Sequence, residues 1–201
     1  MPPQRKLAVM LIRVIEGALP DSLARRAQRA IARLDSTSYF TTFWMPRLAE
    51  PRHAVEEAVA ALWRLAQVRC AGVEWWIGRA HTDALPIGFH FDHDVKGRRR
   101  RHPLLSSVFF FNAVRGGQLV VTDQTPRRRA ATRIESVKPR FNRYALFAGN
   151  LMHGVMKGPG ERPRVTLVVN FWRARPTDVP TWAESGKYAR LCTSRASPSR
   201  R

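Results

Sequence analysis

The chain has 201 residues, and 44% of them are hydrophobic, which is enough to build the core of one domain. No apolar run approaches the roughly 18 residues that a membrane-spanning helix needs. The two cysteines, Cys70 and Cys192, have no paired spacing, which argues against a disulfide scaffold or a zinc site and favours a cytoplasmic location. The formal charge of +20 indicates either an anionic partner, such as nucleic acid, or an arginine-rich composition; we favour composition, because lysine is scarce while alanine and proline are plentiful.

The first third of the chain is predicted to hold one short strand and two helices. A short apolar run at 7–12 follows two basic residues without a small-residue cleavage site, so we expect a strand there, continuing over 11–17, and no signal peptide. A helix is expected to start at Pro20-Asp21-Ser22, with Asp21 or Ser22 as its cap. A second helix is expected over about 51–66. Apolar residues at helical spacing indicate that both helices pack against a core.

From residue 72 onward the pattern changes to short β runs separated by Gly/Pro turns. The runs are 73–79, 88–94, 106–112, 118–122, 143–147 and 165–172. This pattern predicts an α+β fold that is mainly β, a double-stranded β-helix of the jelly-roll type buttressed by the N-terminal helices.

One domain with three parts is expected. Residues 1–71 supply the N-terminal strand and supporting helices as part of the same domain, and residues 72–175 form the double-stranded β-helix core. Residues 176–201 form a C-terminal extension in which 176–188 packs on the body. Its last residues, 193–201, are rich in Ser, Arg and Pro and are predicted to be disordered.

Two histidines and one carboxylate stand out within the β region. His90 and Asp92 are two residues apart, so on a strand their side chains point to one face. His153 follows His90 by 63 residues (153 − 90 = 63), which leaves room for several strands to bring it back beside them. Two histidines and a carboxylate are the ligand set of mononuclear non-haem Fe(II) oxygenases, which keep other coordination positions open. The pattern therefore predicts a metal site made by His90, Asp92 and His153.

Other titratable residues are weaker candidates for the site. His93 is one residue from Asp92, so on a regular strand it faces away from the other ligands. Asp94 shares the ligand face and is either an acceptor for an imidazole N–H or a carboxylate at a strand end. No motif surrounds the remaining histidines, which we interpret as surface or structural residues: His53, His81 and His102.

Arg164 and Thr166 are two residues apart on the last predicted strand, and Arg164 lies eleven residues after His153 (164 − 153 = 11). A guanidinium binds a carboxylate through two parallel hydrogen bonds, so Arg164 could hold an anionic co-substrate. Arg162 is the alternative anchor, but it precedes Pro163 and lies nearer the turn, so we expect it to face solvent. A surface salt bridge is the alternative role for Arg164.

In this order and at these distances, the features resemble the Fe(II)- and 2-oxoglutarate-dependent dioxygenases, in particular the prolyl-hydroxylase-like double-stranded β-helix oxygenases, over roughly 72–172. Arg115-Gly116-Gly117-Gln118-Leu119 is similar to the family's Gly-Gly turn into a middle strand. Residues 143–149 are similar to the strand that leads to the distal histidine. Residues 160–167 are similar to the turn and final strand that carry the arginine.

The resemblance implies Fe(II), 2-oxoglutarate as co-substrate and dioxygen, with His90, Asp92 and His153 as metal ligands and catalytic centre. It assigns the C5 carboxylate of 2-oxoglutarate to Arg164, with Thr166 and Tyr144 as further contacts to the co-substrate.

The implied reaction is hydroxylation of an unactivated C–H bond of a small molecule, amino acid or peptide side chain, with succinate and carbon dioxide as co-products. The carboxylate of Asp92 argues against the halogenating branch and leaves demethylation and desaturation open. Proline is disfavoured as the substrate, because that branch usually carries lysine where this chain has Arg164.

Two other functions remain open. The charge, with arginine clusters at 98–101 and 127–129 in expected loops, prompts oxidative demethylation of nucleic acid. Members with that activity usually carry a further arginine six residues beyond the anchor, where this chain has Asn170, so nucleic acid is not favoured. A non-catalytic basic β-barrel binding protein is the third possibility, but unused buried histidines and carboxylates are costly. No membrane partner is expected.

Overall fold

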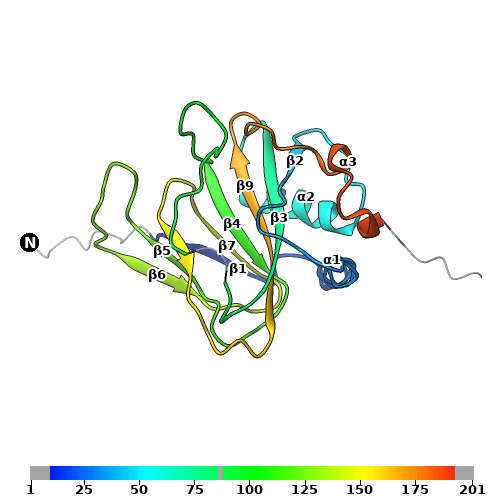
Figure 1. Cartoon of the computed structure of the whole chain (residues 1–201), viewed down its shortest axis with the longest axis horizontal. Coiled ribbons are helices and arrows are strands. Elements are labelled where there is room, and N and C mark those ends of the chain that lie inside the picture. The colour runs from blue at the N-terminus through cyan, green and yellow to red at the C-terminus, as the bar shows by residue number, and fades with distance from the viewer. Residues whose placement is uncertain (1–9, 86–87, 193–201) are drawn as a thin grey trace, which may run out of the picture.

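The computed structural model describes residues 10–85 and 88–192, and over these residues the chain is mainly β (Figure 1). The strands are β1 (Arg13–Glu16), β2 (Phe43–Pro46), β3 (Gly72–His81), β4 (Leu105–Phe110), β5 (Leu119–Thr122), β6 (Ile134–Val137), β7 (Arg143–Ala148), β8 (His153–Val155) and β9 (Pro163–Trp172). The helices are α1 (Asp21–Ala32), α2 (Ala54–Ala66), the short α3 (Trp182–Ser185) and the 3₁₀ turn η1 (Ala189–Cys192).

Two antiparallel sheets face each other and enclose an apolar interior (Figure 1). The larger sheet has the order β1-β7-β4-β9-β3-β2 and the smaller one the order β6-β5-β8. Apolar side chains of β4, β7 and β9 meet those of β5 and β6 between the sheets. The N-terminal strands β1 and β2 pair with β7 and β3, so residues 1–71 contribute to the same sheet as the later strands.

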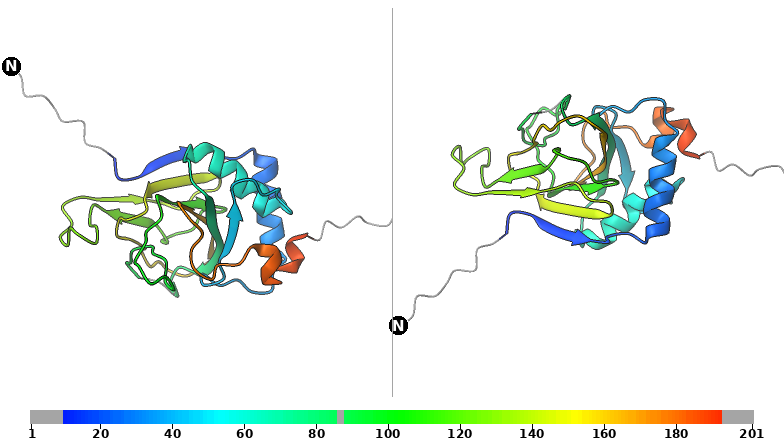
Figure 2. Two further views of the ribbon diagram at one scale, coloured as in Figure 1. Left: turned by 90° about the horizontal axis from the view of Figure 1, so that it is seen from above. Right: turned by 90° about the horizontal axis from the view of Figure 1, so that it is seen from below.

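Helices α1 and α2 cover the outer face of the larger sheet (Figure 2). Period-two alternation along β9 divides its side chains between two environments. The odd-numbered members of 165–171 pack against the helices. The even-numbered members of 164–172 point to the other face, where Arg164 and Val168 line a cavity between the sheets. This alternation decides which residues can reach the site.

Most of the predicted elements are present, and three strands were missed. The expected runs 73–79, 106–112, 118–122, 143–147 and 165–172 correspond to β3, β4, β5, β7 and β9. Strands β2, β6 and β8 were not predicted, because each is only three or four residues long and too short to show a period.

The predicted strands at 7–12 and 88–94 are wrong in extent. β1 begins only at Arg13, and residues 1–9 lie outside the described part of the chain. Residues 88–94 run extended and irregular, with a single β-bridge between His90 and His153. That bridge holds His90 beside His153.

The cap predicted for α1 is also wrong. The N-cap residue is Pro20 and no side chain caps the helix, while the Asp21 carboxylate accepts a hydrogen bond from the Asn142 amide at 3.0 Å. Helix α2 begins after His53, whose Nδ1 accepts the backbone N–H of Glu56 at 3.2 Å. His53 is therefore a structural residue, as predicted.

The C-terminal part of the described chain packs on the helical side of the molecule. Trp182 and Tyr188 contact the core between the larger sheet and the helices, as predicted for 176–188. The segment 193–201, predicted to be disordered, lies outside the described residues. Within the residues described, no helix combines the length and the apolar character needed to cross a membrane.

Candidate active site

His90 and His153 are brought together by the backbone. The His90 N–H donates to the His153 carbonyl at 2.8 Å, and the His153 N–H donates back at 3.0 Å. Two residues in such a pair project their side chains to the same side, and the two imidazole rings lie 4.5 Å apart between centroids. A pair separated by 63 residues (153 − 90 = 63) in sequence thus becomes one half of a site.

Asp92 completes a cluster whose ligand atoms all lie within 4.8 Å of one another. Its carboxylate oxygens are 3.5 Å from His90 Nε2 and 3.4 Å from His153 Nε2. Two imidazole nitrogens and a carboxylate oxygen converging in this way could hold a metal ion. The structure therefore brings together the three residues that the sequence singled out.

Backbone carbonyls orient both imidazole rings. His90 Nδ1 lies 2.8 Å from the Gly88 carbonyl oxygen, and His153 Nδ1 lies 3.0 Å from that of Leu151. A carbonyl oxygen only accepts, so Nδ1 carries the proton in each ring and the neutral ring presents the Nε2 lone pair to the cluster. This is the tautomer that a metal ligand requires.

The electrostatics of the cluster keep Asp92 ionised. Burial opposes its ionisation, but His153, His90 and Ser106 together hold the pKa of Asp92 below its usual range. Burial lowers the pKa of His153, which favours the neutral imidazole. Burial opposes protonation of His90 as well, but Asp92 and the Gly88 carbonyl raise the pKa of that imidazole. A divalent cation would be matched by the Asp92 carboxylate and two neutral imidazoles.

Ser106 supports the carboxylate and was not singled out in the sequence. Its hydroxyl donates to Asp92 Oδ2 at 2.7 Å. The neighbouring Ser107 points to the opposite face of β4, where it donates to the Val169 carbonyl at 2.6 Å and accepts from the Tyr144 hydroxyl at 2.9 Å. The two adjacent serines therefore have separate roles.

We expect Ser106→Ala to weaken Fe(II) binding by about 10-fold, because hydrogen bonds to metal ligands orient them and their loss typically costs 10–100-fold in affinity. Ser107→Ala is the matched control. It should leave iron affinity unchanged and lower the free energy of unfolding by about 1–3 kcal/mol, since it leaves buried partners unsatisfied. Anaerobic Fe(II) titration and denaturant unfolding of both variants measure this. Equal loss of iron affinity in the two variants would contradict the assignment.

Arg164 is a buried cation without an acidic partner among the described residues. Only 1% of it is exposed, and Nη1 donates to Thr166 Oγ1 at 3.3 Å, while Nε and Nη2 have no hydrogen-bond partner. Burial lowers its pKa, but a guanidinium stays charged in proteins. An unpaired buried guanidinium is costly unless an anion binds it. Arg162, the alternative anchor, is exposed.

The Gly-Gly turn gives Arg164 its space. Gly117 has φ +66°, and a Cβ added there would lie 2.9 Å from Arg164 Cδ and 2.9 Å from Thr82 Cγ2. Any other residue would therefore meet both strain and a clash at this position. Asn112 fixes the start of β9 from the other side, with its amide bonded to the Val165 N–H and the Pro163 carbonyl.

A single narrow cavity of about 60 Å³ contains both features. Its lining includes the three clustered residues and Arg164, and apolar side chains supply most of the rest: Trp76, Leu85, Val108, Leu119, Phe147, Val155 and Val168. Apolar walls lower the local dielectric constant and so strengthen electrostatic interactions inside.

Tyr39 also lines this cavity and was not singled out in the sequence. Its hydroxyl is buried without a hydrogen-bond partner, and its ring packs where a Cβ on Gly78 would lie. The same Cβ would also meet the hydroxyl of Thr166, which accepts a hydrogen bond from Arg164, so Tyr39 lies on the Arg164 side of the cavity. Nothing in the sequence near residue 39 marks it, because it lies in the loop between α1 and β2.

Tyr144 does not reach the cavity, so its predicted contact with the co-substrate is wrong. Its ring lies in the core on the helical side of the larger sheet, and its hydroxyl donates to Ser107. The neighbours in β7 that face the cavity side are Ala145 and Phe147. The predicted strand is present as β7, but Tyr144 lies on the face of that strand that packs against the helices.

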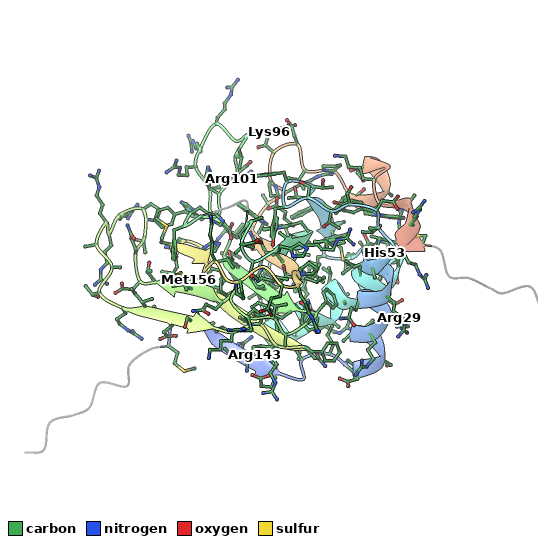
Figure 3. All side chains as sticks on the ribbon, turned by 60° about the horizontal axis from the view of Figure 1, so that its bottom comes forward. Arg29, His53, Lys96, Arg101, Arg143 and Met156 are labelled. Carbon is green, nitrogen blue, oxygen red and sulfur yellow. The ribbon has the colours of Figure 1, made fainter. Side chains whose placement is uncertain are left out.

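The other histidines and Asp94 surround the site without joining the cluster. His93 Nδ1 bonds to the Phe91 carbonyl, and His102 Nδ1 donates to the Asp92 carbonyl oxygen at 2.6 Å. Asp94 accepts from Arg101 and from both the N–H and hydroxyl of Thr177, so it ties the loop after the ligands to the C-terminal segment. Figure 3 shows Arg101 on that loop, near Lys96.

Comparisons with known proteins agree with this geometry. Residues 79–172 match the model of the 2OG-Fe(II) oxygenase superfamily. The structure is similar to a prolyl-4-hydroxylase from Pseudomonas putida, with a TM-score of 0.58 and 22% identity over 84% of this chain and 96% of that chain. A search of curated proteins by sequence found no match.

Two further solved structures share the arrangement. One is a Trichoplax adhaerens prolyl hydroxylase in complex with a peptide fragment of the hypoxia inducible factor oxygen degradation domain (TM-score 0.50, 12% identity, 81% of this chain and 84% of that chain). The other is HygX from Streptomyces hygroscopicus with nickel and 2-oxoglutarate bound (TM-score 0.53, 14% identity, 86% of this chain and 85% of that chain). These likenesses confirm the predicted double-stranded β-helix fold.

Proposed function

We propose that the chain is a non-haem iron dioxygenase of the 2OG-Fe(II) oxygenase superfamily and that it hydroxylates an unactivated C–H bond of a small molecule, amino acid or peptide side chain. One observation carries this proposal. A single cavity is lined by a His-Asp-His cluster and by a buried arginine that has no acidic partner in the described part of the chain.

In this proposal, His90, Asp92 and His153 hold Fe(II). Arg164 binds the far carboxylate of 2-oxoglutarate through its unpartnered Nε and Nη2, and Thr166 orients the guanidinium through Nη1. The unpartnered Tyr39 hydroxyl is a further donor to the same carboxylate. When bound together, Fe(II), 2-oxoglutarate and dioxygen supply the oxidising power for hydroxylation, with succinate and carbon dioxide as co-products.

The protein's own residues orient the reactants and keep water out. Asp92 stays ionised and neutralises part of the metal charge, and Ser106 fixes its second oxygen. Phe147 and Val168 contribute apolar walls to the cavity. Since the carboxylate of Asp92 occupies the position that halide would need, hydroxylation is favoured over halogenation.

A protein or small-molecule substrate is favoured over nucleic acid. The solved relatives include a prolyl hydroxylase bound to a peptide fragment. One arginine of each basic loop has an acidic partner: Arg101 pairs with Asp94, and Arg128 with Asp123. Asn170 stands where a nucleic-acid demethylase would usually carry arginine. The unpaired cysteines, Cys70 and Cys192, are consistent with a cytoplasmic location.

Succinate release tests this function. With Fe(II), 2-oxoglutarate and dioxygen, the wild type should convert 2-oxoglutarate to succinate, and a true substrate should accelerate this conversion and gain one oxygen atom by mass spectrometry. Asp92→Ala should abolish both. Undiminished succinate release by Asp92→Ala would rule out the proposed site as its source.

A further inference from the structure

A groove of about 890 Å³ opens next to the cavity and is lined in part by the residues of the cluster. The groove and the cavity share one wall, which is formed by Tyr39, Trp76, His90 and Asp92. The groove's other walls come from three segments: 40–43, 91–96 and 176–180. A molecule bound there would lie directly against the proposed metal site.

Glu74 lies in this groove and has no role in holding the metal or the co-substrate. It projects from β3 on the same face as Trp76, and Trp172 Nε1 donates to its Oε2 at 3.1 Å. Burial, together with the nearby carboxylate of Asp92, raises the pKa of Glu74 to about 7. Of the lysines and arginines that the structure describes, none compensates this carboxylate.

Asn170 stands directly opposite Glu74 across the β3–β9 pair and faces the same groove. It is 1% exposed, yet its Oδ1 has no hydrogen-bond partner. Buried amides normally satisfy both oxygen and nitrogen, so an unpaired amide oxygen beside a carboxylate that has no basic partner points to a ligand that brings N–H donors.

Other charged groups also line the groove: Asp92, Asp94, Lys96, Asp178 and Lys187. Asp94 pairs with Arg101, and Lys96 lies 3.6 Å from Asp178. Among the described residues, Glu74 is a carboxylate of the groove floor that has no basic partner and no proposed role at the metal, in a protein whose net charge is +20. The rings of Trp76 and Trp172 line the same floor, and indole rings attract cations through their faces.

We propose that Glu74 and Asn170 form the recognition site for a cationic nitrogen group of the substrate, an ammonium or a guanidinium. The inference rests on the proposed function, because it places that group beside a working iron site. The Glu74 carboxylate accepts N–H bonds and neutralises the charge, and the Asn170 amide oxygen accepts a further N–H. Glu74 is thus a specificity-determining residue that selects a basic amino acid or a basic side chain of a peptide.

Matched pairs of ligands test this site on Fe(II)- and 2-oxoglutarate-loaded protein without oxygen. The pairs are L-lysine against L-norleucine and L-arginine against L-citrulline, each free and within a short peptide, with binding followed by calorimetry. In the wild type, at least one cationic member should bind at least about tenfold tighter than its neutral counterpart, as expected for a desolvated charge-assisted bond. The free and peptide forms distinguish the two sources of the cation.

Glu74→Gln keeps the shape and removes the charge, so it should reduce that preference to about twofold or less. Asp178→Asn is the control: it also removes one negative charge from the groove, but at an exposed ion pair, and should keep the preference. Equal binding of cationic and neutral members by the wild type, binding of neither, or an unchanged preference in Glu74→Gln would overturn the proposal. Glu74→Gln should still bind Fe(II) and 2-oxoglutarate with wild-type affinity. If it does, a lost preference for cationic ligands is due to the substrate site and not to a damaged iron site.

Discussion

His90→Ala and His153→Ala are each expected to abolish stoichiometric Fe(II) binding, with affinity falling by at least about 100-fold. Each change removes one of the three groups that converge within 4.8 Å. Loss of a residue that merely orients a ligand costs about 10–100-fold, so loss of the ligand itself should cost more. Anaerobic Fe(II) titration with metal analysis after gel filtration measures the effect.

His93→Ala is the matched control for these variants. This histidine is next to Asp92 in sequence, but its Nδ1 bonds to the Phe91 carbonyl and it does not belong to the cluster. Its iron affinity should stay within a few-fold of the wild type. Undiminished affinity in both His90→Ala and His153→Ala, or an equally large loss in His93→Ala, would mean that the metal is held elsewhere. Asp92→Ala should retain weak iron binding and lose hydroxylation.

Arg164→Ala should weaken 2-oxoglutarate binding by roughly 30-fold or more. The guanidinium is buried and its Nε and Nη2 are free to form a bidentate pair with a carboxylate. Without it, that carboxylate would be desolvated and unpaired, at a cost on the order of 2–5 kcal/mol, and each 1.4 kcal/mol is about tenfold. Titration of Fe(II)-loaded protein with 2-oxoglutarate, followed by the visible charge-transfer band, measures this.

Arg162→Ala is the control, because Arg162 is exposed and an exposed ion pair contributes about 0–1 kcal/mol. It should change 2-oxoglutarate affinity by only a few-fold. Retained iron affinity in Arg164→Ala shows that the barrel is still folded. If Arg162→Ala proved the more damaging change, Arg164 would not be the anchor.

His90, Asp92 and Arg164 could be found in the sequence because short-range spacing carries the relevant geometry. His90 and Asp92 needed only an extended backbone, and they share a face although 88–94 is not a regular strand. Arg164 and Thr166 follow from period-two alternation on a ten-residue strand. His153 lies 63 residues after His90 (153 − 90 = 63) and was identified because this distance is similar to that in the family the sequence resembles.

Residues that depend on contacts between distant strands could not be found in this way. Tyr144 was assigned to the wrong face, since six residues of β7 alternate correctly but do not say which face meets the helices. Ser106 and Ser107 look alike in sequence and differ only in the face they occupy. The Glu74–Asn170 pair, 96 residues apart (170 − 74 = 96), exists only through the register of β3 with β9.

Anaerobic addition of 2-oxoglutarate to the Fe(II)-loaded wild type tests the central claim most directly. If one cavity binds the metal through His90, Asp92 and His153 and the co-substrate through Arg164, a visible metal-to-ligand charge-transfer band should develop and saturate at one equivalent of each. Neither Fe(II) nor 2-oxoglutarate alone should produce it. A spectrum that stays unchanged when both are bound would contradict the account, because it would place the metal and 2-oxoglutarate at separate sites.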